Sequence, residues 1–194
     1  MKSDIQIILA SQSRIRKQLL EEAGLKFKVI VSEADETPDE NKNFQDQLAE
    51  IAWRKAMAVF EQTKDQGRRL ILAGDQNIIF ENKSWGKPAN IKEGRELIGR
   101  MRGTDEVYAY NGNAIILADK DKILQSVNLT DIAQYHIDNI SDEELENYLK
   151  TKVYLTLCGG ISVTDGGFVH RIKGRDSTAR GLTLEYALEI LNNL

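Results

Sequence analysis

Apolar and polar positions alternate along the chain in patterns that distinguish strands from helices. Short apolar runs predict buried strands over residues 5–10, 26–31, 70–73, 78–80, 107–117 and 123–137. Apolar residues spaced three or four positions apart predict helices over residues 13–23, 44–64, 91–101, 141–149 and 182–194. Glycines punctuate residues 153–171, which predicts short strands and turns there. Because strands and helices alternate, the sequence predicts an α/β fold with a mixed sheet.

Local signals mark where several of these elements begin and end. Ser13 is a favourable N-cap for the first helix, and Gly24 is a favourable C-terminal stop. The predicted apolar face of that helix comprises Ile15, Leu19, Leu20 and Ala23. The polar, acidic segment 32–42 predicts a surface loop. Residues 74–77 separate two apolar runs, so we expect the first run to end as a strand just before Asp75.

Composition narrows the class of protein. The chain has 194 residues, of which 41% are hydrophobic and 29% charged, as expected of one globular domain. A formal net charge of −4 gives no basic surface for nucleic acid, although a local basic pocket could still bind a small anion. Cys158 is the single cysteine, and the first apolar run is too short for a signal peptide or a membrane span. We therefore expect a cytoplasmic protein.

The start of the first helix carries an unusual number of cations and hydroxyls. Ser11, Ser13, Arg14, Arg16 and Lys17 crowd a helix end whose unpaired N–H groups already attract anions. Cations are unfavourable there for helix stability, whereas a bound polyanion would account for them. The alternative is a solvated basic turn after an ordinary N-cap. The pattern alone favours the two interpretations about equally, and it does not match the Walker loop.

Three further residues are candidates for chemistry. Lys55 lies in the middle of the apolar stripe of its predicted helix, where an ammonium needs an anion or must extend along the core to reach solvent. Asp75 follows a buried strand, where α/β proteins place catalytic groups, although turn aspartates are commoner. Lys87, between Gly86 and Pro88, is either a phosphate contact or part of a turn. Taken singly, Lys55 and Asp75 are more simply explained as structural.

Metal ligands are less clearly indicated. Glu33, Asp35 and Glu36 could bind a divalent cation through oxygen atoms, although such a run is more often a solvated loop. His136 and His170 lack cysteine or histidine partners at zinc-binding spacing, so a zinc site is not expected. The two tryptophans are too far apart in the sequence to form a stacking platform for nucleic acid.

The order of these motifs is more informative than any one of them. The run Leu-Ala-Ser-Gln-Ser at 9–13 with Arg16, then Asp-Glu at 35–36, then Lys-Ala at 55–56, then Gly-Asp-Gln at 74–76, then Gly-Lys-Pro at 86–88 resembles the Maf family of nucleoside triphosphate pyrophosphatases. The resemblance extends from about Ile5 to the C-terminus, where Phe168-Val169 and Gly181-Leu182 also match. We therefore treat residues 1–194 as a single Maf-like domain.

The resemblance implies a fold, a reaction and a set of roles. It implies an elongated α/β fold with flanking helices and two lobes around a cleft, similar to inosine triphosphate pyrophosphatases. It also implies that a nucleoside triphosphate is cut to a monophosphate and pyrophosphate with Mg²⁺ or Mn²⁺, and that the protein forms a homodimer. By the same resemblance, the residues that hold the phosphate chain are Ser11, Arg16, Lys55 and Lys87. Those that complete the substrate site are Ser13, Lys17 and Gln76. Glu36 would help to hold the metal, and Asp75 would bind the metal or activate water.

The chain departs from the family pattern at several positions, and three of them bear on turnover. Ile15 stands where the family usually has a second arginine, Asp105 where it has a histidine, and Ser162 where it often has a glutamine or glutamate. Because the phosphate and metal residues are present, we expect nucleotide binding and hydrolysis with an altered base preference. The alternative is a non-catalytic nucleotide-binding regulator, linked to cell division as the family has been. We expect neither nucleic acid nor a membrane as a partner.

Overall fold

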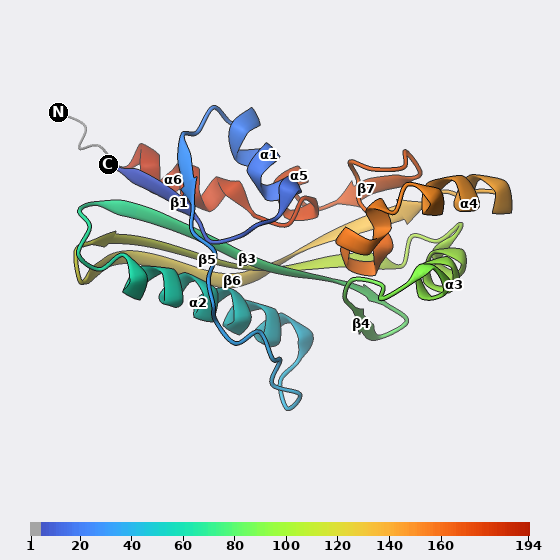
Figure 1. Cartoon of the computed structure of the whole chain (residues 1–194), viewed down its shortest axis with the longest axis horizontal. Helices are drawn as coiled ribbons and strands as arrows, with labels where there is room; N and C mark the ends of the chain where they lie inside the picture. The colour runs from blue at the N-terminus through green and yellow to red at the C-terminus, as the bar shows by residue number, and fades with distance from the viewer. Residues whose placement is uncertain (1–4) are drawn as a thin grey trace. The chain divides into compact units, whose positions relative to one another are not determined.

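The computed structural model describes residues 5–194 and contains, within them, a seven-stranded mixed sheet with helices packed on it (Figure 1). The strands are β1 Gln6–Leu9, β2 Phe27–Val29, β3 Arg69–Phe80, β4 Lys83–Trp85, β5 Val107–Asp119, β6 Lys122–Ile137 and β7 Val169–Lys173. The α-helices are α1 Arg14–Glu22, α2 Phe44–Gln62, α3 Ile91–Met101, α4 Asp142–Lys150, α5 Asp176–Ala179 and α6 Leu184–Asn192. Two 3-10 turns, η1 Val153–Thr156 and η2 Cys158–Gly160, lie between α4 and β7. The predicted α/β class is confirmed.

The chain divides into two compact units. The first unit contains the chain up to Asp75, residues 111–131 and residues 181–194, and the second contains residues 76–110 and 132–180. Strand order in the sheet is β2-β1-β3-β5-β6-β7, with β4 paired to β3. Strands β3, β5 and β6 therefore contribute residues to both units. Within residues 5–194, no helix is both long and apolar enough to cross a membrane.

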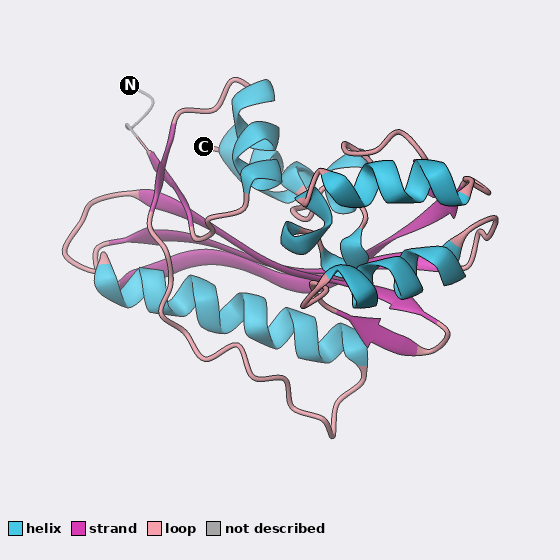
Figure 2. Cartoon of the chain, turned by 45° about the vertical axis from the view of Figure 1, so that its right-hand side comes forward, coloured by secondary structure: helices cyan, strands magenta, loops and turns pink. Residues whose placement is uncertain are grey.

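The first unit has a separate core on each face of its strands. Alternate residues of a strand point to opposite faces, and the buried residues sort in that way. One face packs against α1 and α6 through a cluster that includes Leu9, Leu20, Leu70, Leu72, Ile115 and Leu182. The other packs against α2 through a cluster that includes Ile8, Ala52, Ala56, Ile71, Ala73 and Ile116. Figure 2 shows α2 on one side of these strands and α1 on the other.

The path of the chain through the first unit places a switch in topology between β1 and β3. Helix α1 connects β1 to β2, and α2 connects β2 to β3. Strand β1 lies between the other two and pairs parallel with both. Because α1 and α2 pack on opposite faces, the chain changes face after β2. In open α/β sheets, ligands bind outside the carboxyl ends of the strands at such a point. The loop after β1 and the part of β3 beyond Leu72 lie there.

The second unit is built on the distal part of the long strands. Strand β4 pairs antiparallel with the end of β3, and β7 pairs antiparallel with β6. Helices α3 and α4 cover a cluster that includes Leu97, Met101, Tyr135, Leu149 and Phe168. The buried Tyr135 hydroxyl donates to Ala179 O over 2.7 Å, so its polar end is satisfied inside this core.

Two expectations about secondary structure are wrong. Residues 74–77 do not form a turn, because β3 continues as one strand from Arg69 to Phe80. The turn comes later, at Glu81 and Asn82, whose positive φ angles of 50° and 56° suit a tight hairpin into β4. Residues 153–171 contain two 3-10 turns and a lone bridge before β7 begins at Val169, rather than several short strands.

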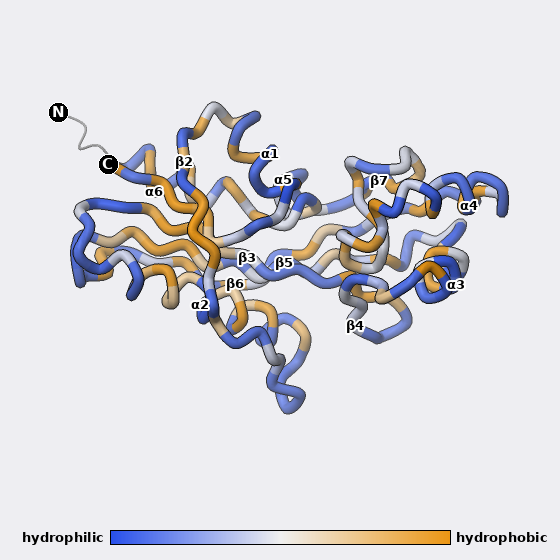
Figure 3. The backbone as a smooth tube through the Cα atoms, in the orientation of Figure 1, coloured by the Kyte–Doolittle hydropathy of each residue, from blue (hydrophilic) through white to orange (hydrophobic). Residues whose placement is uncertain are grey.

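The helices differ from expectation mainly at their ends. The closing helix begins at Leu184, and a short helix, α5, precedes it. On α1 only Leu19 and Leu20 are buried, whereas Ile15 is half-buried and Ala23 is exposed. Figure 3 shows the first unit's strands as mainly hydrophobic and the loop before α2 as mainly hydrophilic, as the sequence pattern predicts.

Candidate functional site

The loop after β1 organises the start of α1 through its two serines. Ser13 is the N-cap, and its Oγ accepts from Arg16 N over 3.4 Å. Ser11 Oγ accepts from Ser13 N over 3.2 Å and from Arg16 Nη1 over 3.0 Å. The first turn of the helix contains no acidic residue, and Lys17 follows Arg16 as a half-buried side chain. The hydroxyls and cations that the sequence singled out are therefore gathered at one helix N-terminus.

The Arg16 guanidinium lies close against Gly74 of β3 and binds the carbonyl of Gly181. Its Nε donates to Gly181 O over 2.6 Å. A Cβ at Gly74 would lie 2.8 Å from Gly181 O and 3.3 Å from Arg16 Nε. A side chain at position 74 would displace the backbone carbonyl to which Arg16 is bound. Glycine at position 74 is therefore required for the guanidinium to lie here.

On the other face, Lys55 joins two carboxylates. Its side chain is 10% exposed, and its Nζ lies 2.6 Å from Asp75 Oδ1 and 2.7 Å from Glu36 Oε2. Asp75 follows Ile71 and Ala73 on the face of β3 that packs against α2, which directs it at this lysine. The buried ammonium is therefore paired with carboxylates, as its burial requires. The side chain does not extend along the core to reach bulk water.

The two groups meet β3 at consecutive residues and from opposite faces. Gly74 accommodates Arg16 on the α1 face, and Asp75 binds Lys55 on the α2 face. The helices on the two faces of the sheet diverge at the topological switch point. Both groups therefore lie beside the place where open α/β sheets bind ligands. The structure thus brings together Ser11, Ser13, Arg16 and Lys17 as one set, and Glu36, Lys55 and Asp75 as another, within the first unit.

The donor set fits a hard divalent cation. Glu36 and Asp75 supply carboxylate oxygens, the ligand type that Mg²⁺ and Mn²⁺ prefer. Among residues 5–194, no group of three or more histidines, cysteines, aspartates or glutamates is arranged to hold a metal by itself. Mg²⁺ commonly takes one or two carboxylates and completes its shell with substrate phosphates and water. The first unit therefore fits a metal that arrives with a phosphorylated substrate.

The remaining predicted residues belong to the second unit. Gln76 donates from Nε2 to Thr178 O over 3.2 Å and to Ala179 O over 3.4 Å, so its amide ties β3 to α5. Lys87 is exposed on the loop after β4. Their placement against Arg16 and Lys55 stays a prediction.

Two of the positions that depart from the Maf pattern have partners within the second unit. Asp105 Oδ1 lies 2.5 Å from His136 Nδ1, and Ser162 Oγ accepts from Thr164 N over 3.1 Å. Each side chain thus takes part in a local interaction of its own.

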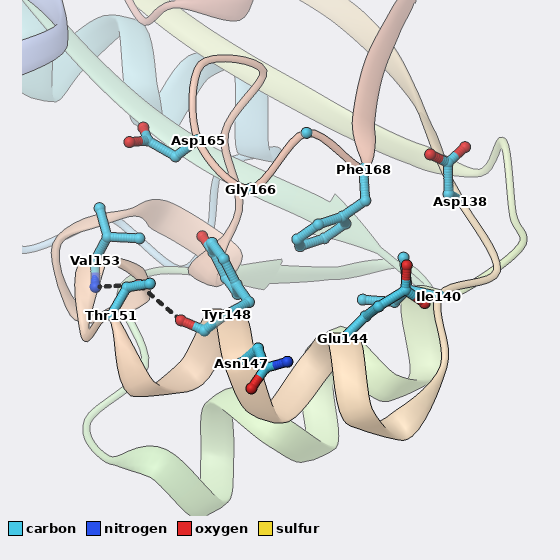
Figure 4. Close-up of a pocket in the computed structure, with 11 residues that line it drawn as sticks. Asp138, Ile140, Glu144, Asn147, Tyr148, Thr151, Val153, Asp165, Gly166 and Phe168 are labelled. Carbon is cyan, nitrogen blue, oxygen red and sulfur yellow. Dashed lines mark hydrogen bonds between the residues drawn. The ribbon is translucent and has the colours of Figure 1, made fainter.

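A pocket in the second unit has the wrong charge for phosphate. It has a volume of about 550 Å³ and lies between α4 and the loop before β7 (Figure 4). Tyr148 and Phe168 form part of its wall, and three carboxylates, Asp138, Glu144 and Asp165, line it. A triphosphate would be repelled there, because clefts lined with one sign of charge exclude ions of the same sign. The candidate site therefore stays at the switch point of the first unit.

Sequence reasoning missed the residues that position Arg16. The sequence pattern places Gly74 between two predicted strands, and Gly181 enters it only in the Gly-Leu pair that matches the Maf family. Gly181 has a φ of +89°, a conformation open to glycine, and its carbonyl is the acceptor for the guanidinium. A glycine inside an apolar strand is the one signal that could have revealed this close approach.

Comparison with known proteins gives one family. The Maf family model, described as "Maf-like protein", matches residues 6–194. A Bacillus cereus (strain ZK / E33L) protein named dTTP/UTP pyrophosphatase is 35% identical over 181 residues, covering 92% of this chain and 90% of the relative. A protein of the same name from Bacillus anthracis gives the same identity and coverage.

A solved structure gives an independent match to the fold. A HAM1 protein from Coxiella burnetii has a TM-score of 0.51 at 16% sequence identity, covering 98% of this chain and all of that one (100%). At that identity the likeness concerns the fold alone.

Proposed function

The chain belongs to the Maf family, and on the geometry of its first unit we propose that it hydrolyses a nucleoside triphosphate to a monophosphate and pyrophosphate. The observation that carries this proposal is the pairing of Asp75 with the buried Lys55 at the topological switch point. Arg16 lies against the neighbouring residue, Gly74, on the opposite face of β3. Carboxylate, ammonium and guanidinium are the groups that phosphoryl transfer requires, because its catalysis is mainly positioning and charge stabilisation.

In this proposal the cations hold the phosphate chain. Arg16 can present two N–H groups to phosphate oxygens, and Ser11 fixes one end of its guanidinium. The N-terminus of α1, capped by Ser13, adds backbone N–H groups and a partial positive charge. Lys17 extends the positive charge along α1. Lys87 and Gln76, in the second unit, are proposed as further substrate contacts.

The carboxylates serve the metal and the water. Glu36 and Asp75 would hold Mg²⁺ or Mn²⁺. The bound metal would neutralise negative charge on the phosphate oxygens. Asp75 also orients the water that attacks the α-phosphorus and accepts its proton. The bond from that phosphorus to the oxygen it shares with the β-phosphate breaks, and pyrophosphate leaves with that oxygen. Lys55 holds the two carboxylates in place through its 2.7 Å and 2.6 Å contacts, and it also contacts the phosphate chain when substrate is bound.

The substrate class follows from the relatives. Because the relatives described above are named dTTP/UTP pyrophosphatases, we propose pyrimidine nucleoside triphosphates as the preferred substrates. The departures at Ile15 and Ser162 would alter the strength of that preference rather than the site of cleavage. We further propose a cytoplasmic enzyme that removes surplus or noncanonical nucleotides, acts as a homodimer and binds no nucleic acid.

A panel assay tests the proposal. Wild-type protein, Asp75→Asn and the matched control Asp65→Asn, at an exposed turn, are incubated with Mg²⁺ or Mn²⁺ and dTTP, UTP, CTP, GTP, ITP or 7-methyl-GTP. We expect pyrophosphate release that is greatest with dTTP or UTP, and a loss of about a hundredfold or more in Asp75→Asn only, since Asp75 acts on both water and metal.

Two results would contradict the proposal. An Asp75→Asn variant as active as the wild type would remove the catalytic assignment. Nucleotide binding by the wild type without any pyrophosphate release would favour the non-catalytic regulator instead.

A further inference from the structure

Arg16 binds a carbonyl that is itself held by a buried polar network. Gly181 lies in the turn between α5 and α6, and turns are held less firmly than strands unless side chains fix them. Here the fixing groups come from β5. Asn111 and Asn113 are each 0% exposed, and they point to the face of β5 that also buries Ile115 and Leu117.

The two asparagines hold successive residues of that turn. The Asn111 amide is assigned with its nitrogen toward Gly181 O at 2.8 Å and its oxygen toward Leu182 N at 3.3 Å, because this orientation gives the carbonyl a donor and the N–H an acceptor. In the opposite orientation the nitrogen donates to Asn113 Oδ1 over 3.0 Å instead. Asn113 Oδ1 accepts from Thr183 N over 2.8 Å, and its Nδ2 donates to Thr183 Oγ1 over 3.2 Å. Disturbing a buried amide whose hydrogen bonds are satisfied is energetically costly, so Asn111 fixes the Gly181 carbonyl and Asn113 fixes Thr183, where α6 begins.

The backbone between the asparagines is also fixed. A Cβ at Gly112 would lie 2.1 Å from Leu48 O, so β5 contacts the first turns of α2 directly. The register of Asn111 is thereby set from the opposite face. Strand β5, which carries none of the residues that the sequence singled out, thus contacts the turn at Gly181 on one face and the helix that carries Lys55 on the other.

Asn111 and Arg16 share one acceptor. Gly181 O receives Arg16 Nε at 2.6 Å and the Asn111 nitrogen at 2.8 Å. We propose that Asn111 is a positioning residue of the pyrophosphatase reaction, which sets the direction of the Arg16 guanidinium by fixing the carbonyl that both groups bind. This inference rests on the proposed function for its catalytic consequence, but the position of Arg16 itself does not depend on that function.

A double-mutant cycle tests the catalytic consequence. Pyrophosphate release from UTP is measured for the wild type, Asn111→Ala, Arg16→Ala and the double variant. We expect Asn111→Ala to lower kcat/KM by up to about a hundredfold, mainly through kcat, because misplacing a catalytic group by about 1 Å has that effect. In the Arg16→Ala background the same change should cost less than about twofold, since residues that act through one another are not additive. Equal losses in both backgrounds would overturn the proposal.

Two further variants separate positioning from stability. Asn113→Ala removes an equally buried amide that does not bind Gly181 O, so it should lower the thermal midpoint and leave the Arg16-dependent activity in place. Asn111→Asp keeps the size of the side chain and replaces the donor with an oxygen, so it tests the same contact if Asn111→Ala fails to fold. We expect it to reproduce the kcat defect. An Asn111→Asp protein with wild-type kcat would overturn the proposal.

A spectroscopic measurement decides the structural half without any turnover. The Arg16 Nε–H signal, identified by its loss in Arg16→Lys, should exchange slowly with water in the wild type and in Asn113→Ala. It should exchange at least about tenfold faster in Asn111→Ala or Asn111→Asp, because its acceptor is no longer fixed. An unchanged exchange rate would overturn the inference. Absence of pyrophosphate release by the wild type would instead overturn the proposed function.

Discussion

The two ends of the first-unit part of β3 each hold a buried cation, and the cations are satisfied in different ways. Arg69, at the start of the strand, is 0% exposed and donates to Thr63 Oγ1, Lys120 O, Gln66 O, Gly67 O and Phe60 O. Lys55, opposite Asp75, is 8% exposed and pairs with two carboxylates. The first cation is bound by neutral oxygens of the fold, and the second by acidic side chains.

This difference separates a structural cation from one suited to chemistry. A guanidinium surrounded by backbone carbonyls closes the loops around it, and burial lowers the pKa of Arg69 from its usual value. The hydrogen bonds of Arg69 use all five of its guanidinium N–H groups, and the residue is 0% exposed, so none of them is available to a ligand. A lysine held by Asp75 and by the more exposed Glu36 can exchange partners when a phosphate or a metal arrives.

Replacing Arg69 should have the largest effect on stability. Arg69→Met would leave a hydroxyl and several carbonyls without their donor, so we expect the free energy of unfolding to fall by about 3 kcal/mol or more. Urea unfolding measures this, with the exposed Lys64→Met as the control. Activity per folded molecule should stay the same. A stable Arg69→Met protein with impaired turnover would remove the distinction between the two cations.

Replacing Lys55 should affect nucleotide binding more than stability. Lys55→Met relieves the cost of burying the ammonium, and the carboxylates that it leaves behind keep access to solvent, with side chains 57% and 19% exposed for Glu36 and Asp75. We therefore expect a loss of only about 1 kcal/mol in unfolding free energy. Binding of a nucleoside triphosphate should weaken about tenfold or more, because one charge on the phosphate is no longer matched. Isothermal titration calorimetry measures this change in affinity, with the exposed Lys28→Met as the control. Normal binding by Lys55→Met would show that the lysine is structural, like Arg69.

Replacing Glu36 should have the smallest effect on the fold. Glu36 is 57% exposed, and exposed ion pairs contribute little to stability. We expect Glu36→Gln to unfold like the wild type but to need a higher Mg²⁺ concentration for half-maximal activity, since metal affinity follows the charge of the ligands. The same change at exposed Glu33 provides the control. An unchanged Mg²⁺ requirement would place the metal away from Glu36.

The sequence predicted the fold class because hydrophobic periodicity records which face of each element is buried. The strand β1 and the helix α2 follow directly from that pattern. It failed at residues 74–77, where polar side chains in an extended strand have the same composition as a turn. Pairing with β4 is a tertiary contact, and local composition does not encode it. The cleft between lobes stays a prediction.

The charged residues of the candidate site could be predicted from the sequence, whereas the residues that hold them in place could not. The cations near the start of α1 and the lysine on an apolar stripe violate local preferences, and such violations indicate function. Gly181 and Asn111 violate nothing in the sequence. They act through contacts between residues far apart in the chain, such as Arg16 with Gly181. The prediction that Gln76 binds substrate also remains open, since its amide is shown donating to α5.

The central claim is that the residues around the switch point cut between the α- and β-phosphates. Phosphorus NMR of UTP with Mg²⁺ and the wild-type protein tests it most directly, with Asp75→Asn measured beside it. The account predicts that UMP and pyrophosphate accumulate in equal amounts with the wild type, and that the variant leaves UTP intact over the same time. Release of UDP and phosphate, or equal conversion by both proteins, would contradict it.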